Sequence, residues 1–279
     1  MKKDRIVLNK GTYSVYLDKV PCKNCGDDIY ASKQTLHKHG HAFCSVECKC
    51  IHTQKRKDPK GANILDNVKD ADFYYLLGLL ASDGTIIYPQ SDNKYVAYAC
   101  RLHLSKKDEM LLNDIHDKFG GTITSDRSKY IIWQLTHKKF LLFLKDIGIT
   151  TKKTNFLDIT LWFNTLDDKF KWSFFRGYFD GDGTIYRYTP KNAGYCIHNA
   201  SIVFKSETVF NMFKQFFKTY HFREYTEMNK MGNTMYRLSF HGSYAIPVLR
   251  AMYDISGIKL KRKYNKYLNL KEYYERNNI

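Results

Sequence analysis

An eleven-residue segment occurs twice in the chain, and this repeat constrains the fold more than any other feature of the sequence. Residues 76–86 read LLGLLASDGTI, and residues 175–185 read FRGYFDGDGTI. Gly78 pairs with Gly177, and the four residues from Asp83 match the four from Asp182, all at an offset of 99 positions. Such self-similarity indicates that one supersecondary unit is used twice in a single polypeptide.

The segments that follow the repeat also match in kind. Each copy continues from an apolar, helix-compatible stretch (72–81 in the first copy) into two strands, an amphipathic helix, a hairpin and a further helix. Each then ends at a Gly-Ile pair followed by a basic cluster, from Gly148 and from Gly257. In the first copy, the second strand is predicted at 95–104, the amphipathic helix at 107–119, the last strand at 130–136 and the last helix at 138–146. In the second copy, the same four elements are predicted at 196–204, 206–220, 235–240 and 243–254.

These elements predict an α+β fold built from two pseudo-symmetric αββαββα units and a small N-terminal module. We expect the module and a basic linker in residues 1–60, the first unit in 61–160 and the second in 161–279. A peripheral C-terminal helix is expected from residue 264 onward. Two similar units suit a roughly symmetric partner such as duplex DNA.

Small residues at helical spacing characterise the repeated segment. Small side chains on one helix face let two helix backbones approach closely. The residues concerned are Gly78, Ala81 and Ser82 in the first copy, and Gly177, Asp180 and Gly181 in the second. We therefore expect the two repeated helices to pack against each other along this face.

Packing of these helices would bring their C-terminal ends, and with them Asp83 and Asp182, close together. Each helix end carries about half a negative charge, and carboxylates at such a point suit Mg²⁺. We expect the following Gly84 and Gly183 to end the helices, because glycine tolerates positive φ. In one copy an Asp-Gly pair would be no more than a turn, but its repetition favours a metal site.

Four cysteines near the N-terminus have the spacing of a zinc site. Cys22 and Cys25 form one short pair, and Cys44 and Cys48 form a second pair eighteen residues later. Two such pairs can supply four thiolates to a structural Zn²⁺. Cys50 is an alternative to Cys48 as the fourth ligand. Residues 1–60 hold thirteen Lys and Arg against six Asp and Glu, so we interpret this module as an accessory DNA-binding element.

The charge of the whole chain limits the classes of partner that the protein is expected to bind. There are 45 Lys and Arg against 28 Asp and Glu, a formal net charge of +17. Basic residues spread along the chain among 22 Tyr and 18 Phe favour nucleic acid over a membrane surface. The mean hydropathy is −0.50, and no apolar run approaches the roughly 18 residues that span a bilayer. The N-terminus leads into no apolar signal segment, so we expect an intracellular protein that is not secreted.

Taken together, these motifs resemble the LAGLIDADG homing endonucleases in their single-chain, two-motif form, over residues 72 to 264. The resemblance implies that the motif helices form the interface between the units and that Asp83 and Asp182 bind the catalytic divalent metal, Mg²⁺ or Mn²⁺. It also implies that the two sheets form a saddle over the DNA major groove, and that both strands are cut across the minor groove. The first Asp of the motif corresponds to Asp180 in the second copy but to Ala81 in the first.

The resemblance further implies a basic residue near each scissile phosphate. Counted from the Gly-Ile pairs, the candidates are Lys152 and Lys261, with Lys153 and Lys263 as neighbours. Polar side chains that alternate with apolar ones along the strands, or follow them, are candidates for DNA contacts. These are Arg101, His103, Ser105, Lys106, Gln134, Ser201, Lys205, Ser206 and Arg237.

The function expected from these features is that of a monomeric, site-specific DNA endonuclease that hydrolyses both strands of a long duplex target. The alternative is a non-cleaving DNA or RNA binder on the same scaffold, either an intron maturase or a transcription regulator. Double-stranded DNA is the expected partner, and RNA of a host intron is the second candidate.

Overall fold

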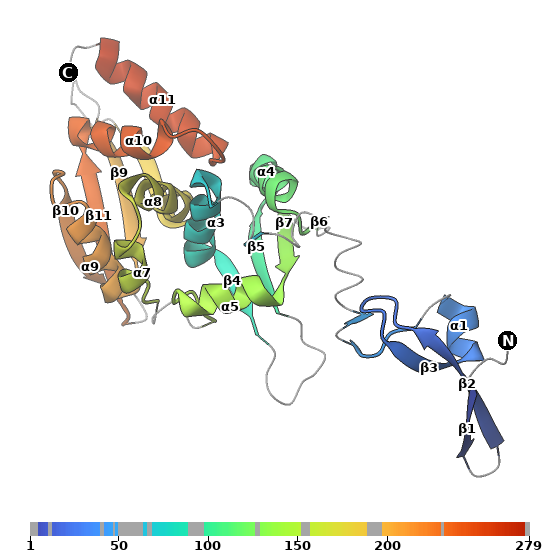
Figure 1. Cartoon of the computed structure of the whole chain (residues 1–279). Helices are drawn as coiled ribbons and strands as arrows, with labels where there is room; N and C mark the ends of the chain where they lie inside the picture. Colours follow the sequence, from blue (N-terminus) through green and yellow to red (C-terminus); the bar gives the residue numbers. More distant parts are fainter. Residues whose placement is uncertain are drawn as a thin grey trace. The chain divides into compact units, whose positions relative to one another are not determined.

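The computed structural model describes residues 5–10, 13–39, 42–46, 48–49, 64–65, 69–88, 98–125, 129–151, 157–188, 197–229 and 232–276. The chain divides into two compact units, Met1–Ala62 and Asn63–Ile279 (Figure 1). None of the helices in the described part of the chain is long and apolar enough to cross a membrane.

The N-terminal unit contains an antiparallel sheet that the sequence analysis did not anticipate. Strands β1 (Arg5–Lys10), β2 (Tyr13–Pro21) and β3 (Asp28–Ser32) pair in that order. Helix α1 (Lys33–His39) follows β3 directly. The chain returns from α1 to form a bridge between Ala42 and Cys22, so the second cysteine pair lies beside the end of β2.

Two helices from the repeated segments pack against each other in the C-terminal unit. They are α3 (Ala71–Ser82) and α8 (Asp168–Asp182) (Figure 1). Helix α3 begins at Asp70, whose side chain accepts hydrogen bonds from the backbone N–H groups of Asp72 and Phe73, both at 3.1 Å. This is the usual N-cap arrangement for Asp. The predicted packing of the repeated helices is confirmed.

The first half of this unit continues from α3 into a four-stranded antiparallel sheet of order β4-β5-β7-β6. Leu102, Trp133 and Leu135 are fully buried on one face of this sheet, which the helices cover. The strands are β4 (Gly84–Ile87), β5 (Ala99–Ser105), β6 (Thr122–Ser125) and β7 (Tyr130–Thr136), and the helices are η2 (Lys106–Asp108), α4 (Glu109–Phe119) and α5 (Lys138–Asp146).

The second half repeats this order after the short helix α7 (Thr160–Asn164) and α8. Its sheet has the order β10-β11-β9-β8, and Phe204, Phe213 and Phe217 fill an aromatic core beneath it. The elements are β8 (Gly183–Tyr188), β9 (Ile197–Phe204), α9 (Glu207–Phe216), β10 (Arg223–Met228), β11 (Thr234–His241), η3 (Gly242–Tyr244), α10 (Ala245–Tyr253) and the C-terminal helix α11 (Lys261–Arg276). Two αββαββα units are thus present, and the predicted fold class is confirmed.

The motif helices end at the predicted places, directly before Gly84 and at Gly183, but positive φ is not the reason for glycine there. Gly84 and Gly183 are not among the described glycines with positive φ, and Gly183 is extended, with φ −83° and ψ 164°. A different constraint requires glycine here. A Cβ on Gly84 would lie 2.5 Å from the carbonyl oxygen of Leu80, and one on Gly183 would lie 2.4 Å from the ring of Phe179. Each strand leaves over the last turn of its own helix, where no side chain fits.

Candidate functional site

The two motif helices end beside each other. Asp83 caps the C-terminus of α3, and α8 ends at Asp182. Gly181 of α8 lies so close to the other helix that an added Cβ would be 2.1 Å from Ser82 Oγ and 3.2 Å from Asp83 Oδ2. Residues that are 99 positions apart in the sequence therefore meet at one point, as the repeat predicted.

A pocket with a volume of about 370 Å³ lies at this point and combines residues of both halves of the unit. Asp83 and Asp182 both line it. The turn after strand β9 contributes Lys205 and Ser206, two residues that were predicted from the sequence to contact DNA. The complete lining consists of Ala81, Ser82, Asp83, Gly84, Tyr178, Asp182, Val203, Lys205, Ser206 and Met235.

The negative charges of Asp83 and Asp182 act on the same pocket. Tyr178 also lines this pocket and is buried. Burial raises the pKa of its hydroxyl, with further increases from the negative charges of Asp182 and Asp83. The negative ends of two helix dipoles add to this potential. Two carboxylates that come from separate helices and line one pocket match the hard oxygen ligands that Mg²⁺ and Mn²⁺ take.

A buried lysine lies next to the acid pair. Lys263 is 3% exposed, and its Nζ donates hydrogen bonds to the backbone carbonyls of Phe179 at 2.7 Å and Asp180 at 2.8 Å. Burial lowers the pKa of Lys263 to about 8, while the charges of Asp180, Asp83 and Asp182 act in the opposite direction. The site thus places one cation against the C-terminal end of α8, beside the two aspartates.

The structure places Lys263, and not Lys261, at this position. Helix α11 begins at Lys261, three residues before the predicted start at 264. Successive helix residues differ in direction by about 100°, so Lys261 is exposed while Lys263 is directed toward α8. The sequence candidate of the first copy, Lys152, lies outside the described residues, as does Lys153.

The DNA-contact candidates of the first sheet share one face. Arg101, His103 and Ser105 on β5 alternate with the core residue Leu102, and Arg101 pairs in register with Gln134 of β7. The Arg101 Nε donates a hydrogen bond of 2.6 Å to Gln134 Oε1. Lys106 follows as an exposed residue at the start of η2. This face is polar and is not covered by the helices.

The second sheet presents the equivalent face. Ser201 pairs with Ser239, and Arg237 pairs with Val203. Arg237 forms an ion pair with Glu227 and lies 4.9 Å from the ring centroid of Tyr225. Its guanidinium is therefore held in place before any partner binds.

Ser206 has a structural task in addition to lining the pocket. It is 6% exposed, donates to the carbonyl of Leu157 at 2.9 Å, and accepts from the Val209 N–H at 3.4 Å as the N-cap of α9. Lys205, by contrast, is exposed. The ammonium group of Lys205 therefore takes no part in the cap of α9.

Two tyrosines on the same face were missed by the sequence analysis. Tyr186 and Tyr188 of β8 are 39% and 48% exposed. Tyr186 pairs in register with Asn199 and accepts its side-chain N–H at 2.6 Å. Continuing the strand alternation from Thr184 would have identified both, since every second residue of β8 shares this face.

The four cysteines of the N-terminal unit form one cluster. Their Sγ atoms all lie within 4.8 Å of one another, and Cys44 Sγ is 3.6 Å from Cys25 Sγ and 3.3 Å from Cys48 Sγ. A tetrahedral Zn²⁺ with bonds of about 2.3 Å requires sulfur separations of about 3.8 Å, so this donor set fits zinc. Cys50, the alternative ligand, lies outside the described residues.

Backbone N–H groups surround the first cysteine of this cluster. The N–H of Cys44 donates to Cys22 Sγ at 3.4 Å. Backbone N–H groups, first that of Cys25 and then those of Cys44 and Asn24, lower the pKa of the Cys22 thiol to about 6 against the opposing effect of burial. The turn from Cys22 to Cys25 is therefore suited to hold a thiolate, the form of cysteine that binds metal.

Comparison with known proteins supports the fold. No protein-family model and no curated protein sequence matches the chain. Among solved structures it is similar to the LAGLIDADG meganuclease I-AabMI bound to uncleaved DNA, with a TM-score of 0.52 and 13% identity over 73% of this chain and 91% of that one. It is similar to I-SmaMI bound to its uncleaved DNA target with calcium ions, with a TM-score of 0.50 and 13% identity over 74% and 92%.

The LAGLIDADG homing endonuclease I-GzeII in complex with its DNA target aligns with a TM-score of 0.49 and 15% identity, over 71% of this chain and 88% of that one. At such identities a structural likeness concerns the fold. The two alignments with TM-scores of 0.50 and 0.52 show that the chain has the two-unit fold seen in LAGLIDADG nucleases.

Proposed function

We propose that the protein is a LAGLIDADG homing endonuclease that binds a long duplex DNA target and hydrolyses one phosphodiester bond in each strand. One observation carries the proposal: Asp83 and Asp182, from two copies of one motif, line a single pocket at the ends of paired helices. The polar faces of the two sheets and the net charge of +17 supply a surface that suits the phosphates and base edges of DNA.

Asp83 and Asp182 would hold the divalent metal, either Mg²⁺ or Mn²⁺. When bound, such a metal polarises the phosphoryl oxygen and lowers the pKa of coordinated water. The residues of the chain have separate tasks. Asp83 and Asp182 supply one carboxylate from each motif helix to hold the metal in place. Lys263 stabilises negative charge that develops at a scissile phosphate.

The N-terminal unit would act as a zinc-stabilised accessory DNA-binding element. Its four-cysteine cluster fits Zn²⁺, and its segment is basic, with thirteen Lys and Arg against six Asp and Glu in residues 1–60. A unit this small gains much of its stability from a bound metal. We expect deletion of residues 1–60 to weaken DNA affinity and shorten the footprint while cleavage by the remaining unit persists.

The decisive test is cleavage of a randomised duplex library in Mg²⁺, with EDTA as one control. Recurrent breaks in both strands at one long sequence are expected from the unsubstituted protein. Asp83→Asn and Asp182→Asn each remove one carboxylate charge from the pocket, so both should abolish double-strand cleavage while binding to the selected target persists. Asp168→Asn makes the same change at an exposed aspartate in the first turn of α8, at the other end of that helix from Asp182, and as the matched control it should retain cleavage.

The same experiment tests the alternative function. Tight, salt-sensitive binding to duplex DNA with no break in any sequence would replace the endonuclease by a DNA-binding regulator. Preference for structured RNA over duplex DNA, again without cleavage, would favour a maturase. Loss of binding in both aspartate variants, with the fold intact, would mean that these residues position DNA and hold no catalytic metal.

A further inference from the structure

A short segment before the C-terminal helix runs across both motif helices. We call residues 257–260 the crossing segment. The backbone N–H of Ile258 donates to Asp72 Oδ1 of α3 at 2.6 Å, and the backbone N–H of Leu260 donates to Asp180 Oδ2 of α8 at 2.7 Å. One carboxylate from each motif helix therefore fixes the same four-residue segment.

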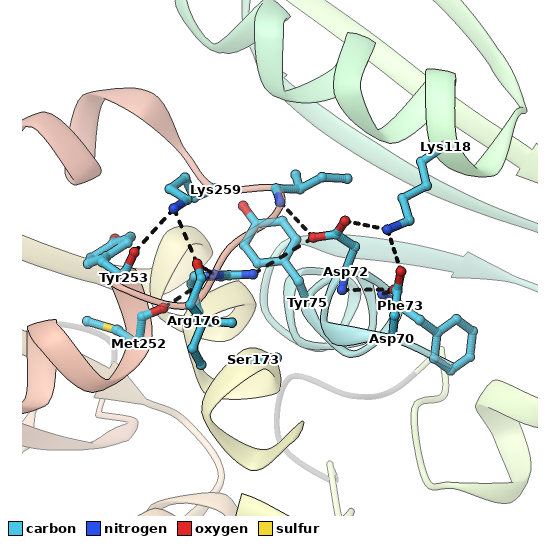
Figure 2. A network of polar contacts seen from close by, with 12 residues as sticks. Asp70, Asp72, Phe73, Tyr75, Lys118, Ser173, Arg176, Met252, Tyr253 and Lys259 are labelled. Carbon is cyan, nitrogen blue, oxygen red and sulfur yellow. Dashed lines mark hydrogen bonds and ion pairs between the residues drawn. The ribbon is translucent and has the colours of Figure 1, made fainter. Parts of the chain in front are cut away.

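The end of the segment near α3 is held by a network of charged groups (Figure 2). Asp72 also accepts from Lys118, and Arg176 lies 3.9 Å from it. Arg176 is fully buried and donates to the carbonyls of Met252 and Ile255 at the end of α10. The chain that enters the crossing segment is thus fixed from both α3 and α8.

Asp180 is buried and holds the other end of the crossing segment by a hydrogen bond. It is 2% exposed, and its carboxylate accepts hydrogen bonds from the Tyr75 hydroxyl at 2.9 Å and the Tyr253 hydroxyl at 2.6 Å, in addition to the Leu260 N–H. A buried carboxylate is tolerated only when such bonds replace its hydration. The first copy of the motif has Ala81 at the matching position, so this arrangement belongs to one half of the protein.

Leu260 is where helix α11 starts. Its carbonyl accepts the backbone N–H groups of Lys263 and Tyr264, both at 3.0 Å, which are the first hydrogen bonds of that helix. Lys263 lies in this first turn, and its Nζ contacts the carbonyls at the end of α8. The position of Leu260, set by Asp180, therefore determines where the Lys263 ammonium lies relative to Asp182.

We propose that Asp180 is a positioning residue that acts through Leu260 and Lys263 on the cut of one DNA strand only. The inference rests on the proposed function, since it assigns Asp180 a task within the same site. Because Ala81 replaces Asp180 in the first copy, loss of the Asp180 carboxylate removes support from one side of the site and leaves the other side intact. The protein would then become a strand-biased nicking enzyme.

The test is single-turnover cleavage of the target duplex, with a different end label on each strand. In Asp180→Ala, the rate constant for one strand should fall by about 10²-fold relative to the other, as expected for a catalytic group displaced by about 1 Å. Asp180→Asn keeps an oxygen for the Leu260 N–H and should restore most of the balance. Tyr75→Phe removes a different hydrogen bond from the same carboxylate oxygen and should leave the ratio of the two rates unchanged.

A purely structural role for Asp180 predicts another pattern. Both strands would then be cut more slowly by the same factor, in proportion to lost stability, and this result or an unchanged ratio overturns the inference. If Asp180→Ala does not fold, as judged by its thermal melt, Asp180→Ser takes its place with the same criterion. An unsubstituted protein that cuts neither strand overturns the proposed function, and this inference with it; normal cleavage by the unsubstituted protein with no bias in the variants overturns the inference alone.

Discussion

Gly78 and Gly177 lie against each other's helices so closely that neither has room for a Cβ. An added Cβ on Gly78 would be 1.9 Å from the carbonyl oxygen of Phe174 in α8, and one on Gly177 would be 2.0 Å from that of Tyr75 in α3. The contact is reciprocal, with the same residue type in the same place on each helix. It brings Asp83 and Asp182 to one pocket, because both helices run from this contact to their C-terminal ends.

The first prediction concerns this contact. Gly177→Ala should destabilise the C-terminal unit by about 3 kcal/mol, the upper part of the usual range for overpacking, because the obstacle is backbone of the opposite helix and cannot rotate away. The measurement is the urea unfolding midpoint of the full chain. Gly232→Ala is the control, since its Cβ would meet nothing within 4 Å and only its φ of +77° opposes the change. Equal losses in the two variants would contradict the packing argument.

The second prediction assigns the fourth zinc ligand. Cys48→Ser should abolish stoichiometric Zn²⁺ binding at neutral pH, whereas Cys50→Ser should retain it, because Cys48 Sγ belongs to the cluster with Cys22, Cys25 and Cys44. The measurement is the metal content of the purified protein together with the absorption spectrum of its Co²⁺ form. Cys100→Ala, which removes a buried cysteine of the first sheet, should bind zinc normally.

Chelation gives an independent check of that assignment. Removal of zinc should unfold the N-terminal unit, since metal binding and folding are coupled in modules of this size, and should leave the melting of the C-terminal unit unchanged. If Cys48→Ser still binds zinc and Cys50→Ser does not, the fourth ligand is Cys50 and the assignment of Cys48 is wrong.

The sequence allowed the paired motif helices, both sheets and the meeting of Asp83 with Asp182 to be predicted. The repeat excludes most alternative topologies, and the hydrophobic periodicity identifies each helix and strand separately. Strand β7 and helix α5 match their predicted ranges, 130–136 and 138–146.

Residue roles that depend on where a helix begins could not be predicted in this way. Counting from the Gly-Ile pair aligned Lys261 with Lys152, but the start of α11 decides which lysine of the cluster faces α8, and the crossing segment fixes that start through Asp180. Ser206 is a similar case, since a serine between a strand and a helix is also a preferred N-cap. The sheet of the N-terminal unit depends on pairing between separate strands, for which the cysteine spacing carries no information.

The third prediction concerns the first sheet face. Arg101 and Gln134 share a hydrogen bond of 2.6 Å, so they should contribute to target recognition as one pair. Arg101→Ala and Gln134→Ala should each relax the base preference at the same target position by about 1–3 kcal/mol. The measurement is the affinity for targets substituted at each position, analysed as a double-mutant cycle.

The coupling energy between these two substitutions should lie within about 0.5–3 kcal/mol. Lys106→Ala is the control, because an exposed lysine that contacts phosphate should weaken all targets alike and reduce the salt dependence by about one charge. Additive effects of Arg101→Ala and Gln134→Ala, or effects at separate target positions, would show that the two residues act independently.

The last prediction separates the two lysines of the C-terminal cluster. Lys263→Met should slow cleavage by about 10²–10³-fold, the usual effect of losing one group that stabilises charge in a transition state, because its ammonium lies beside the acid pair. Lys261→Met removes the same charge from the same helix turn but from an exposed position, and should leave the rate constant of cleavage nearly unchanged. Both variants are compared under single-turnover conditions with saturating protein, so that weaker DNA binding does not contribute.

The hydrogen bonds from Lys263 to the end of α8 require a second control, because their loss could itself disturb the site. Lys263→Arg retains the positive charge and the capacity to donate to the carbonyls of Phe179 and Asp180, although its planar fork differs in shape from an ammonium. We expect its thermal stability to exceed that of Lys263→Met and its cleavage rate to lie between those of the unsubstituted protein and Lys263→Met. If Lys261→Met is the slower of the two methionine variants, the helical position of Lys263 has no catalytic meaning and the residue counted from the Gly-Ile pair is the one that acts.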